Sequence, residues 1–394
     1  MAANKSSRLG VVFPVGLPLL VLACFFPCSS CHCDVSVSKN TDEHDGEAGA
    51  ASEGIKGMFV FGSSLVDNGN NNFLPDSLAK ADYLPYGIDF PIGPSGRFTN
   101  GKNVIDLFGD HLKLPSFVPA FADPKTKGTK ILHGVNFASG ASGILDDTGS
   151  LAGHVINLNQ QIRNFEEVTL PELEAELGRC TTSQSLEDYL FVVGTGGNDY
   201  SFNYFLTTSS RNVTLETFTA NLTASLSTQL KKLHSLGARK FVLMSINPLG
   251  CSPVVRMSRP THNGCMQKLN RAAHLFNTHL KSLVDGMRVQ MPGSSLVFVN
   301  SYKIIRDIIK NPISKGFKDA STTCCEVASI NEGGNGILCK KGGQVCGNRS
   351  SLVFFDGLHP TEAVNVQIAT KAFASSLKTE VYPTNIKRMT TRNM

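Results

Sequence analysis

Two residues near the carboxyl end of the chain could together activate a hydroxyl nucleophile. Asp356 and His359 lie three residues apart in VFFDGLHPTEAVN (353–365), just before a helix predicted to begin at Pro360 or Thr361. At that spacing the carboxylate can hold the imidazole in one tautomer while the other ring nitrogen faces outward. A serine needs such a base, because an unassisted hydroxyl is a poor nucleophile at neutral pH.

The serine that fits this base is Ser64, in FGSSLVDNGNN (61–71). That segment follows the apolar run GMFVFG (57–62), which predicts a buried strand. A serine at a strand-to-helix turn can point its hydroxyl out of the sheet, with a helix N-terminus beneath it. Taken alone, however, the segment favours a simpler role in which Ser63 or Ser64 is a helix N-cap.

Two glycine-rich segments could bind the negative oxygen that forms when a serine attacks a carbonyl. GTGGNDY (194–200) places the amide of Asn198 just after another apolar run, although asparagine is also common in tight turns. GVNFASGASGI (134–144) allows close backbone approach, and Gly140 there could offer its N–H to an oxyanion.

The elements that must position these residues alternate along the chain. Apolar runs that predict buried strands occur at 57–62, 189–194, 240–247 and 295–300. Between them lie amphipathic helices, for example one whose Leu222, Leu226, Leu230 and Leu233 share a face. Such alternation predicts one domain with a parallel sheet between two helix layers. Ligands in such sheets bind beyond the carboxyl ends of the strands, so we expect the chemistry just after each strand.

Together, and in this order, the segments resemble the GDSL-type esterase/lipase family of serine hydrolases, in its plant branch. The resemblance covers about residues 57 to 378, nearly the whole predicted domain. It is also carried by GRFTNGKNVIDLFGDHLKLP (96–115), PLGCSP (248–253) and FFDGLHPTEAVN (354–365).

The resemblance implies a role for each candidate residue. Ser64 matches the nucleophile, His359 the general base and Asp356 the residue that orients it. Gly140 and Asn198 match the oxyanion hole, which the Ser64 backbone N–H completes. The implied fold is a flavodoxin-like three-layer α/β/α domain, and the implied activity is hydrolysis of carboxylic esters or lipids through an acyl-enzyme, with no metal or organic cofactor.

Two other activities stay open on the same residues: acyl transfer to an alcohol, and a catalytically silent binding protein that kept the fold. The second is motivated by Ser63, which stands where the family has the aspartate of its name. That aspartate is not a member of the triad, so its loss puts efficiency in doubt without removing the machinery. The intact Ser64, Asn198, Asp356 and His359 favour an active enzyme.

The N-terminus predicts a secreted protein. Lys5 and Arg8 precede an apolar run at 11–26 and then small residues, the order typical of a signal peptide at 1–30 with cleavage at about 28–33. A membrane anchor is the alternative, but this run is shorter than the roughly 20 residues that a spanning helix needs. No other stretch of the chain is long and apolar enough to span a bilayer.

The rest of the chain divides into three parts. Residues 31–56 are acidic and polar and predict a disordered leader, residues 57–382 the hydrolase domain, and residues 383–394 a basic tail. By family resemblance the destination is the cell wall or apoplast.

Cysteine usage agrees with an oxidising compartment. The disulfide candidates are Cys251, Cys265, Cys324, Cys325, Cys339 and Cys346. Cys251 and Cys265 flank a short loop and are the first pair we expect, while the vicinal Cys324 and Cys325 should reach separate partners. Cys180 is left over; it is free, or it pairs with Cys31 or Cys33 if one of these survives cleavage. A zinc site is disfavoured because the chain has no paired C-x-x-C set.

Three sequons, at Asn212, Asn221 and Asn348, predict a glycoprotein. The net charge of +5 is mild and its basic residues are scattered, which argues against a nucleic-acid partner. GRFTNGKN (96–103) imitates a phosphate loop but has Asn103 where that loop needs serine or threonine. The partner we expect instead is a small-molecule substrate, an ester or lipid, as the family resemblance implies. We expect the enzyme to be a monomer.

Overall fold

The structure, a computed structural model, describes residues 54–178, 186–206, 213–258, 264–329 and 334–391. These residues belong to the second of two units into which the chain divides, 51–394. The expected signal peptide, nearly all of the acidic leader, Cys180 and Asn212 lie outside the described residues.

A central sheet holds the four predicted strands. These four are β1 (Gly57–Gly62), β2 (Tyr189–Gly194), β3 (Lys240–Met244) and β4 (Ser295–Val299). A fifth, short strand, β7 (Val381–Tyr382), joins them. Their order is β1-β2-β3-β4-β7, with the first four parallel and β7 antiparallel at the edge. The expected parallel sheet is confirmed, although two of the predicted strands end slightly earlier than expected.

An irregular segment extends the sheet beyond β1. Residues 133–139 run alongside β1, with Val60 N–H donating to Val135 O at 3.0 Å and Phe137 N–H donating to Val60 O at 2.7 Å. Counting this segment as the second strand in the chain gives the spatial order 2-1-3-4-5, the doubly wound order of flavodoxin-like folds. A stretch that the sequence indicates only as a glycine-rich loop therefore forms an edge of the sheet.

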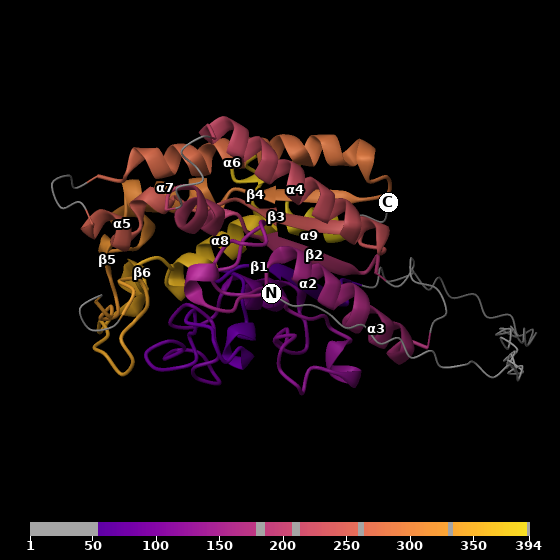
Figure 1. The fold of residues 1–394 in the computed structure, drawn as a ribbon, viewed down its shortest axis with the longest axis horizontal. Helices are drawn as coiled ribbons and strands as arrows, with labels where there is room; N and C mark the ends of the chain where they lie inside the picture. The colour runs from indigo at the N-terminus through magenta and orange to yellow at the C-terminus, as the bar shows by residue number, and fades with distance from the viewer. Residues whose placement is uncertain (1–53, 179–185, 207–212, 259–263, 330–333, 392–394) are drawn as a thin grey trace, which may run out of the picture. The chain divides into compact units, whose positions relative to one another are not determined.

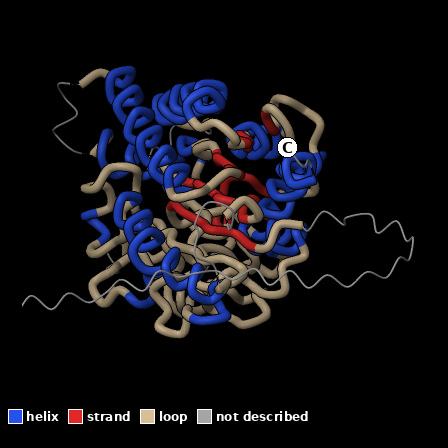
Figure 2. Tube along the Cα trace, turned by 90° about the vertical axis from the view of Figure 1, so that its right-hand side faces the viewer, coloured by secondary structure: helices blue, strands red, loops and turns tan. Residues whose placement is uncertain are grey.

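Helices cover both faces of the sheet (Figures 1 and 2). Alternate side chains of a strand point to opposite faces, so each strand contributes to two cores. Phe59, Phe61, Phe191 and Phe241 face one core, while Met58, Val60, Val192 and Val242 face the other. The first core is covered by α2 (Leu158–Asn164), α3 (Leu170–Glu176), α4 (Leu215–Ser235) and α6 (Gln267–Gln290).

The second core is covered by α1 (Val104–Leu112), α7 (Ser301–Lys310), α8 (Glu362–Ala374) and α9 (Ile386–Thr391). The predicted leucine face of α4 is confirmed, because its four members, Leu222, Leu226, Leu230 and Leu233, are all buried in the first core. The segment 383–394, interpreted from sequence as a basic tail, includes α9, whose Ile386 and Met389 are buried.

A smaller unit beside the sheet is held by two disulfides. Strands β5 (Asp319–Thr323) and β6 (Leu352–Phe354) pair in parallel, and between them the chain is closed by Cys324–Cys346 and Cys325–Cys339. The third disulfide joins Cys251 to Cys265, next to the short helix α5 (Pro253–Met257). In the structure Cys251 bonds to Cys265, and the vicinal Cys324 and Cys325 have separate partners, the arrangement expected from the sequence.

Candidate active site

Ser64 lies in a tight turn at the carboxyl end of β1. Ser63 N–H donates to Gly194 O at the end of β2, and Val66 N–H donates to Ser63 O, both at about 3 Å. Gly62, with a φ of +146°, begins the turn, and a Cβ there would lie 2.2 Å from Gly194 O. The expected helix N-terminus beneath Ser64 is not found: the chain makes a single turn there, a short 3-10 helix follows only at Asn70–Phe73, and α1 begins at Val104.

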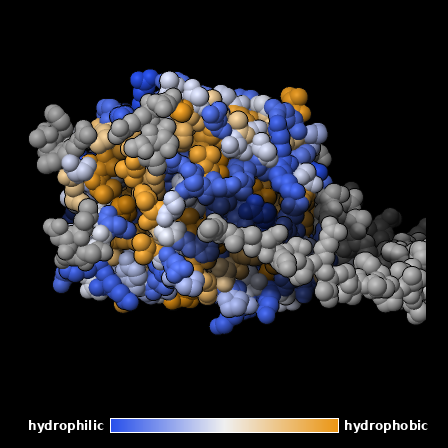
Figure 3. Space-filling model, in the orientation of Figure 1, coloured by the Kyte–Doolittle hydropathy of each residue, from blue (hydrophilic) through white to orange (hydrophobic). Residues whose placement is uncertain are grey.

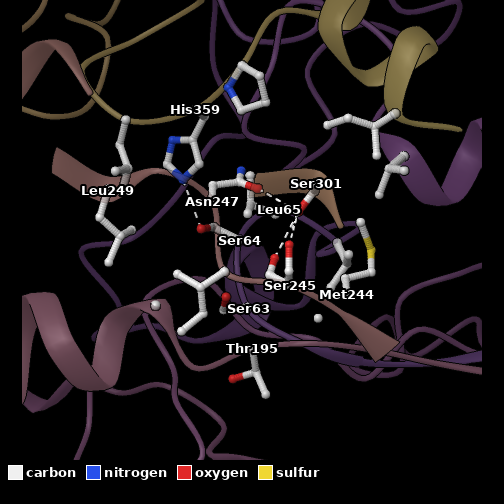
Figure 4. Close-up of a pocket in the computed structure, with 18 of the residues that line it drawn as sticks. Ser63, Ser64, Leu65, Thr195, Met244, Ser245, Asn247, Leu249, Ser301 and His359 are labelled. Carbon is white, nitrogen blue, oxygen red and sulfur yellow. Dashed lines mark hydrogen bonds between the residues drawn. The ribbon is translucent and has the colours of Figure 1, made fainter. Parts of the chain in front are cut away.

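Ser64, His359 and Asp356 form a continuous hydrogen-bonded relay. His359 Nε2 lies 2.8 Å from Ser64 Oγ, and His359 Nδ1 lies 2.8 Å from Asp356 Oδ2. Figure 4 shows the imidazole pointing at the Ser64 hydroxyl, with the Ser63 side chain farther from the ring. All three relay residues are at most 9% exposed.

The Asp356 carboxylate is fixed by donors on both oxygens. Oδ1 accepts the backbone N–H groups of Leu358 at 2.8 Å and His359 at 2.7 Å. Oδ2 accepts the Tyr86 hydroxyl at 2.6 Å in addition to His359 Nδ1. An ionised carboxylate only accepts, so His359 carries its proton on Nδ1 and presents the Nε2 lone pair to Ser64.

An aromatic ring packs against the imidazole of His359. The Phe98 ring centre lies 4.9 Å from that of His359. Its neighbour Arg97 makes a buried two-point ion pair with Asp106 of α1, both distances being 2.7 Å. Thr99 then donates to Pro360 O at 3.0 Å, which ties this segment to the residue that follows His359.

The backbone donors near Ser64 differ from the expected set. Gly140 N–H donates to Asp67 Oδ2 at 2.9 Å, so it is not available to an oxyanion. The N–H groups of Ser64 and Ala141 have no hydrogen-bond partner among the described residues. Ala141 lines the same cavity as Ser64 and has a φ of +66°, an uncommon conformation for a residue other than glycine.

The third candidate donor, Asn198, follows β2 as expected. Its Nδ2 donates to Ser142 O at 2.9 Å, which leaves one of the two amide hydrogens for the cavity that Asn198 also lines. The next residue, Asp199, binds the loop that carries Ala141 and Ser142. Its carboxylate accepts hydrogen bonds from Ile144 N–H, Leu145 N–H and the Thr148 hydroxyl.

Two buried carboxylates therefore hold the loop that carries Ala141. Burial raises the pKa of Asp67 to about 6, against the opposing effect of N–H donors from Gly69, Asn70 and Gly140. Burial likewise raises the pKa of Asp199 to about 6, although it too accepts several hydrogen bonds. Neither carboxylate touches the relay; each acts on the backbone beside it.

Two cavities meet at Ser64. The larger, about 540 Å³, has mostly apolar walls and is also lined by Ser64, Asn198 and His359. Its apolar lining is Leu78, Ala79, Phe98, Ala141, Leu151, Ala152, Phe202, Leu206, Ile337, Leu338 and Leu358. The smaller, about 60 Å³, lies at the ends of β1 to β3 and includes Thr195, Ser245 and Asn247. Hydrophobic residues also gather on the left of the face drawn in Figure 3.

The remaining sequence candidates are placed as follows. Asn221 on α4 and Asn348 in the disulfide-closed unit are both exposed. Asn103 caps α1 by accepting from Ile105 N–H and Asp106 N–H. Among the described residues there is no group of three or more His, Cys, Asp or Glu side chains suited to a metal ion. Within the same residues, no helix has the length and apolar character needed to cross a membrane.

Sequence reasoning missed four residues that shape the site: Tyr86, Asp67, Ala141 and Asp199. Asp67 and Asp199 lie inside segments that the sequence did single out, so their acidic type was a usable signal. No local signal indicated Tyr86, because its partner Asp356 is 270 residues away in the sequence.

Known proteins resemble this chain over most of its length. The family profile described as GDSL-like Lipase/Acylhydrolase matches residues 58–372. The Arabidopsis thaliana protein GDSL esterase/lipase At1g29670 is 40% identical over 336 residues, or 84% of this chain and 90% of that protein. GDSL esterase/lipase At5g08460, also from Arabidopsis thaliana, is 41% identical over 342 residues, or 84% and 86% of the two chains.

Proposed function

The chain belongs to the GDSL-like lipase/acylhydrolase family, whose matched relatives are named as esterases and lipases, and from that premise we propose that it is a serine hydrolase of carboxylic esters. The observation that carries the proposal is the buried relay from Ser64 Oγ through His359 to Asp356, with a 2.8 Å contact on each side of the imidazole. That geometry is what an activated serine requires.

In the proposed reaction Ser64 Oγ attacks the ester carbonyl carbon as His359 Nε2 takes the hydroxyl proton. The carbonyl oxygen becomes an oxyanion that receives the N–H groups of Ser64 and Ala141 and the free amide hydrogen of Asn198. His359 then gives its proton to the leaving alcohol, and an acyl-enzyme remains. Water then attacks the acyl carbon as His359 Nε2 takes one of its protons. Collapse of the second oxyanion breaks the bond between the acyl carbon and Ser64 Oγ, and His359 returns the proton to Ser64 Oγ as the acid leaves.

The substrate we propose has an apolar portion. The 540 Å³ cavity at Ser64 offers eleven apolar side chains and no charged residue, so an alkyl or aryl group gains free energy by entering it. We also propose that the protein is secreted; three disulfides and two exposed sequon asparagines among the described residues support this.

The test is hydrolysis of model esters of graded acyl length by the purified protein and two serine variants. Ser64→Ala should abolish hydrolysis, because the relay ends at Ser64 Oγ. Ser63→Ala, the matched control one residue away, should keep a substantial fraction, because its backbone N–H still holds the turn. Loss of activity in Ser63→Ala with activity kept in Ser64→Ala would overturn the assignment. Adding an alcohol and looking for a new ester distinguishes transfer from hydrolysis.

A further inference from the structure

Tyr86 connects the Asp356 carboxylate to the loop closed by the Cys325–Cys339 disulfide. Its side chain is fully buried, and its ring makes edge-on contacts with those of Tyr83 and Phe355, whose centres are 5.4 and 5.7 Å away. Its hydroxyl oxygen is 2.6 Å from Asp356 Oδ2 and 3.0 Å from the backbone nitrogen of Cys339.

The direction of both hydrogen bonds follows from the chemistry of the partners. The Cys339 N–H can only donate, so the Tyr86 oxygen accepts there and its own hydrogen points at Asp356. Burial, reinforced by the negative charge of Asp356, raises the pKa of Tyr86 well above its ordinary value near 10. The phenol therefore stays protonated and remains a donor over the working pH range.

Asp356 Oδ2 thus receives two hydrogen bonds, one from Tyr86 and one from His359 Nδ1. A second donor draws negative charge from the carboxylate, which leaves less charge to stabilise a protonated imidazole. We propose that Tyr86 is a positioning residue that holds Asp356 in register with His359 and lowers the basicity of that imidazole. The consequence is that His359 becomes a neutral base at a lower pH than Asp356 alone would allow. The inference rests on the proposed function for its role in catalysis.

Other titratable groups near the relay do not obscure this effect. The two cavities that His359 lines contain no other acidic or basic side chain. Asp67 and Asp199 titrate near pH 6 but are the same in the wild type and in every variant below. The charged groups on neighbouring segments have their own partners: Arg97 binds Asp106, and Glu362 accepts from Lys102 N–H.

Tyr83 provides a matched control. It belongs to the same turn, and its hydroxyl donates to Cys339 O at 2.9 Å, but it makes no hydrogen bond to Asp356. Tyr83→Phe therefore removes a hydroxyl that anchors the same loop and leaves both oxygens of the carboxylate occupied as before.

The experiment measures the titration of the His359 imidazole by NMR, assigned with His359→Gln, together with kcat/KM against pH for a model ester. Tyr86→Phe should move the midpoint of both upward by about 0.5–1 pH unit. Tyr83→Phe should leave it in place. An unchanged or lower midpoint in Tyr86→Phe, or an equal shift in Tyr83→Phe, overturns the inference. The NMR titration needs no ester, so a failure of the proposed function is seen separately as absent turnover in the wild type.

A second measurement covers the case in which Tyr86→Phe does not fold. Full-length wild type made with 3-fluorotyrosine carries a more acidic phenol at position 86, and this phenol is a stronger donor to Asp356. The His359 midpoint should then move downward, opposite to the effect of Tyr86→Phe. A midpoint unchanged or raised by the fluorine contradicts the role of the Tyr86 hydroxyl.

Discussion

Replacing Asn198 by alanine should lower turnover and leave the binding of the ester nearly unchanged. One Nδ2 hydrogen of Asn198 is held by Ser142 O at 2.9 Å, so only the other can reach an oxyanion. Because that charge develops only in the transition state, losing one such donor costs about 2.7–4 kcal/mol, or about 10²–10³ in kcat. The lost bond to Ser142 O should reduce stability separately, by about 0.5–1.5 kcal/mol.

The assay is kcat and KM for a chromogenic ester, with the free energy of unfolding measured on the same samples. Thr195→Val is the matched control: Thr195 lies three residues earlier in the same loop, and its buried hydroxyl has no partner among the described residues. Valine keeps the shape, so kcat should stay at the wild-type value and stability should not fall. A raised KM with unchanged kcat in Asn198→Ala would refute the oxyanion role. An equal loss of kcat in Thr195→Val would attribute the effect to the loop instead.

Two further predictions concern stability. The pKa of Asp67 and of Asp199 is about 6 in the folded chain and about 3.9 when unfolded, so the folded state binds these protons more readily. The contribution of these two groups to the free energy of unfolding is fully present below about pH 4. It is lost as the pH rises through 6, by about 3 kcal/mol per group. Denaturant unfolding from pH 4 to 7 should show a smaller fall in Asp199→Asn than in the wild type, and an equal or larger fall contradicts the reasoning. Removing the Cys251–Cys265 disulfide in Cys251→Ser/Cys265→Ser should cost about 3 kcal/mol, because it closes a loop of 14 residues; an unchanged free energy of unfolding would contradict this.

The strands and main helices could be predicted because their burial is written into local patterns. GMFVFG and YLFVVG are buried on both faces, so they are continuous apolar runs, and the leucines of α4 repeat at helical spacing. The edges could not be predicted in the same way. Strand β7 has only two residues, and the segment 133–139 pairs with β1 without a regular pattern of its own.

The site divides similarly. Ser64, Asn198, Asp356 and His359 each lie just after a strand, in segments with recognisable composition. The choice between Gly140 and Ala141 as a donor depends instead on a backbone angle and on the contact with Asp67, which no local pattern encodes. Positive φ angles are usually expected at glycine, yet the residue with a φ of +66° in this segment is Ala141.

The distance along the chain between Ser64 and His359 has a consequence for biosynthesis. The two residues are 295 positions apart, and α8, α9 and β7, which complete the sheet and its second layer, all follow His359. At typical synthesis rates His359 leaves the ribosome about 15–60 s after Ser64. During that interval the growing chain has Ser64 without His359, so the relay on which the proposed hydrolysis depends cannot yet form.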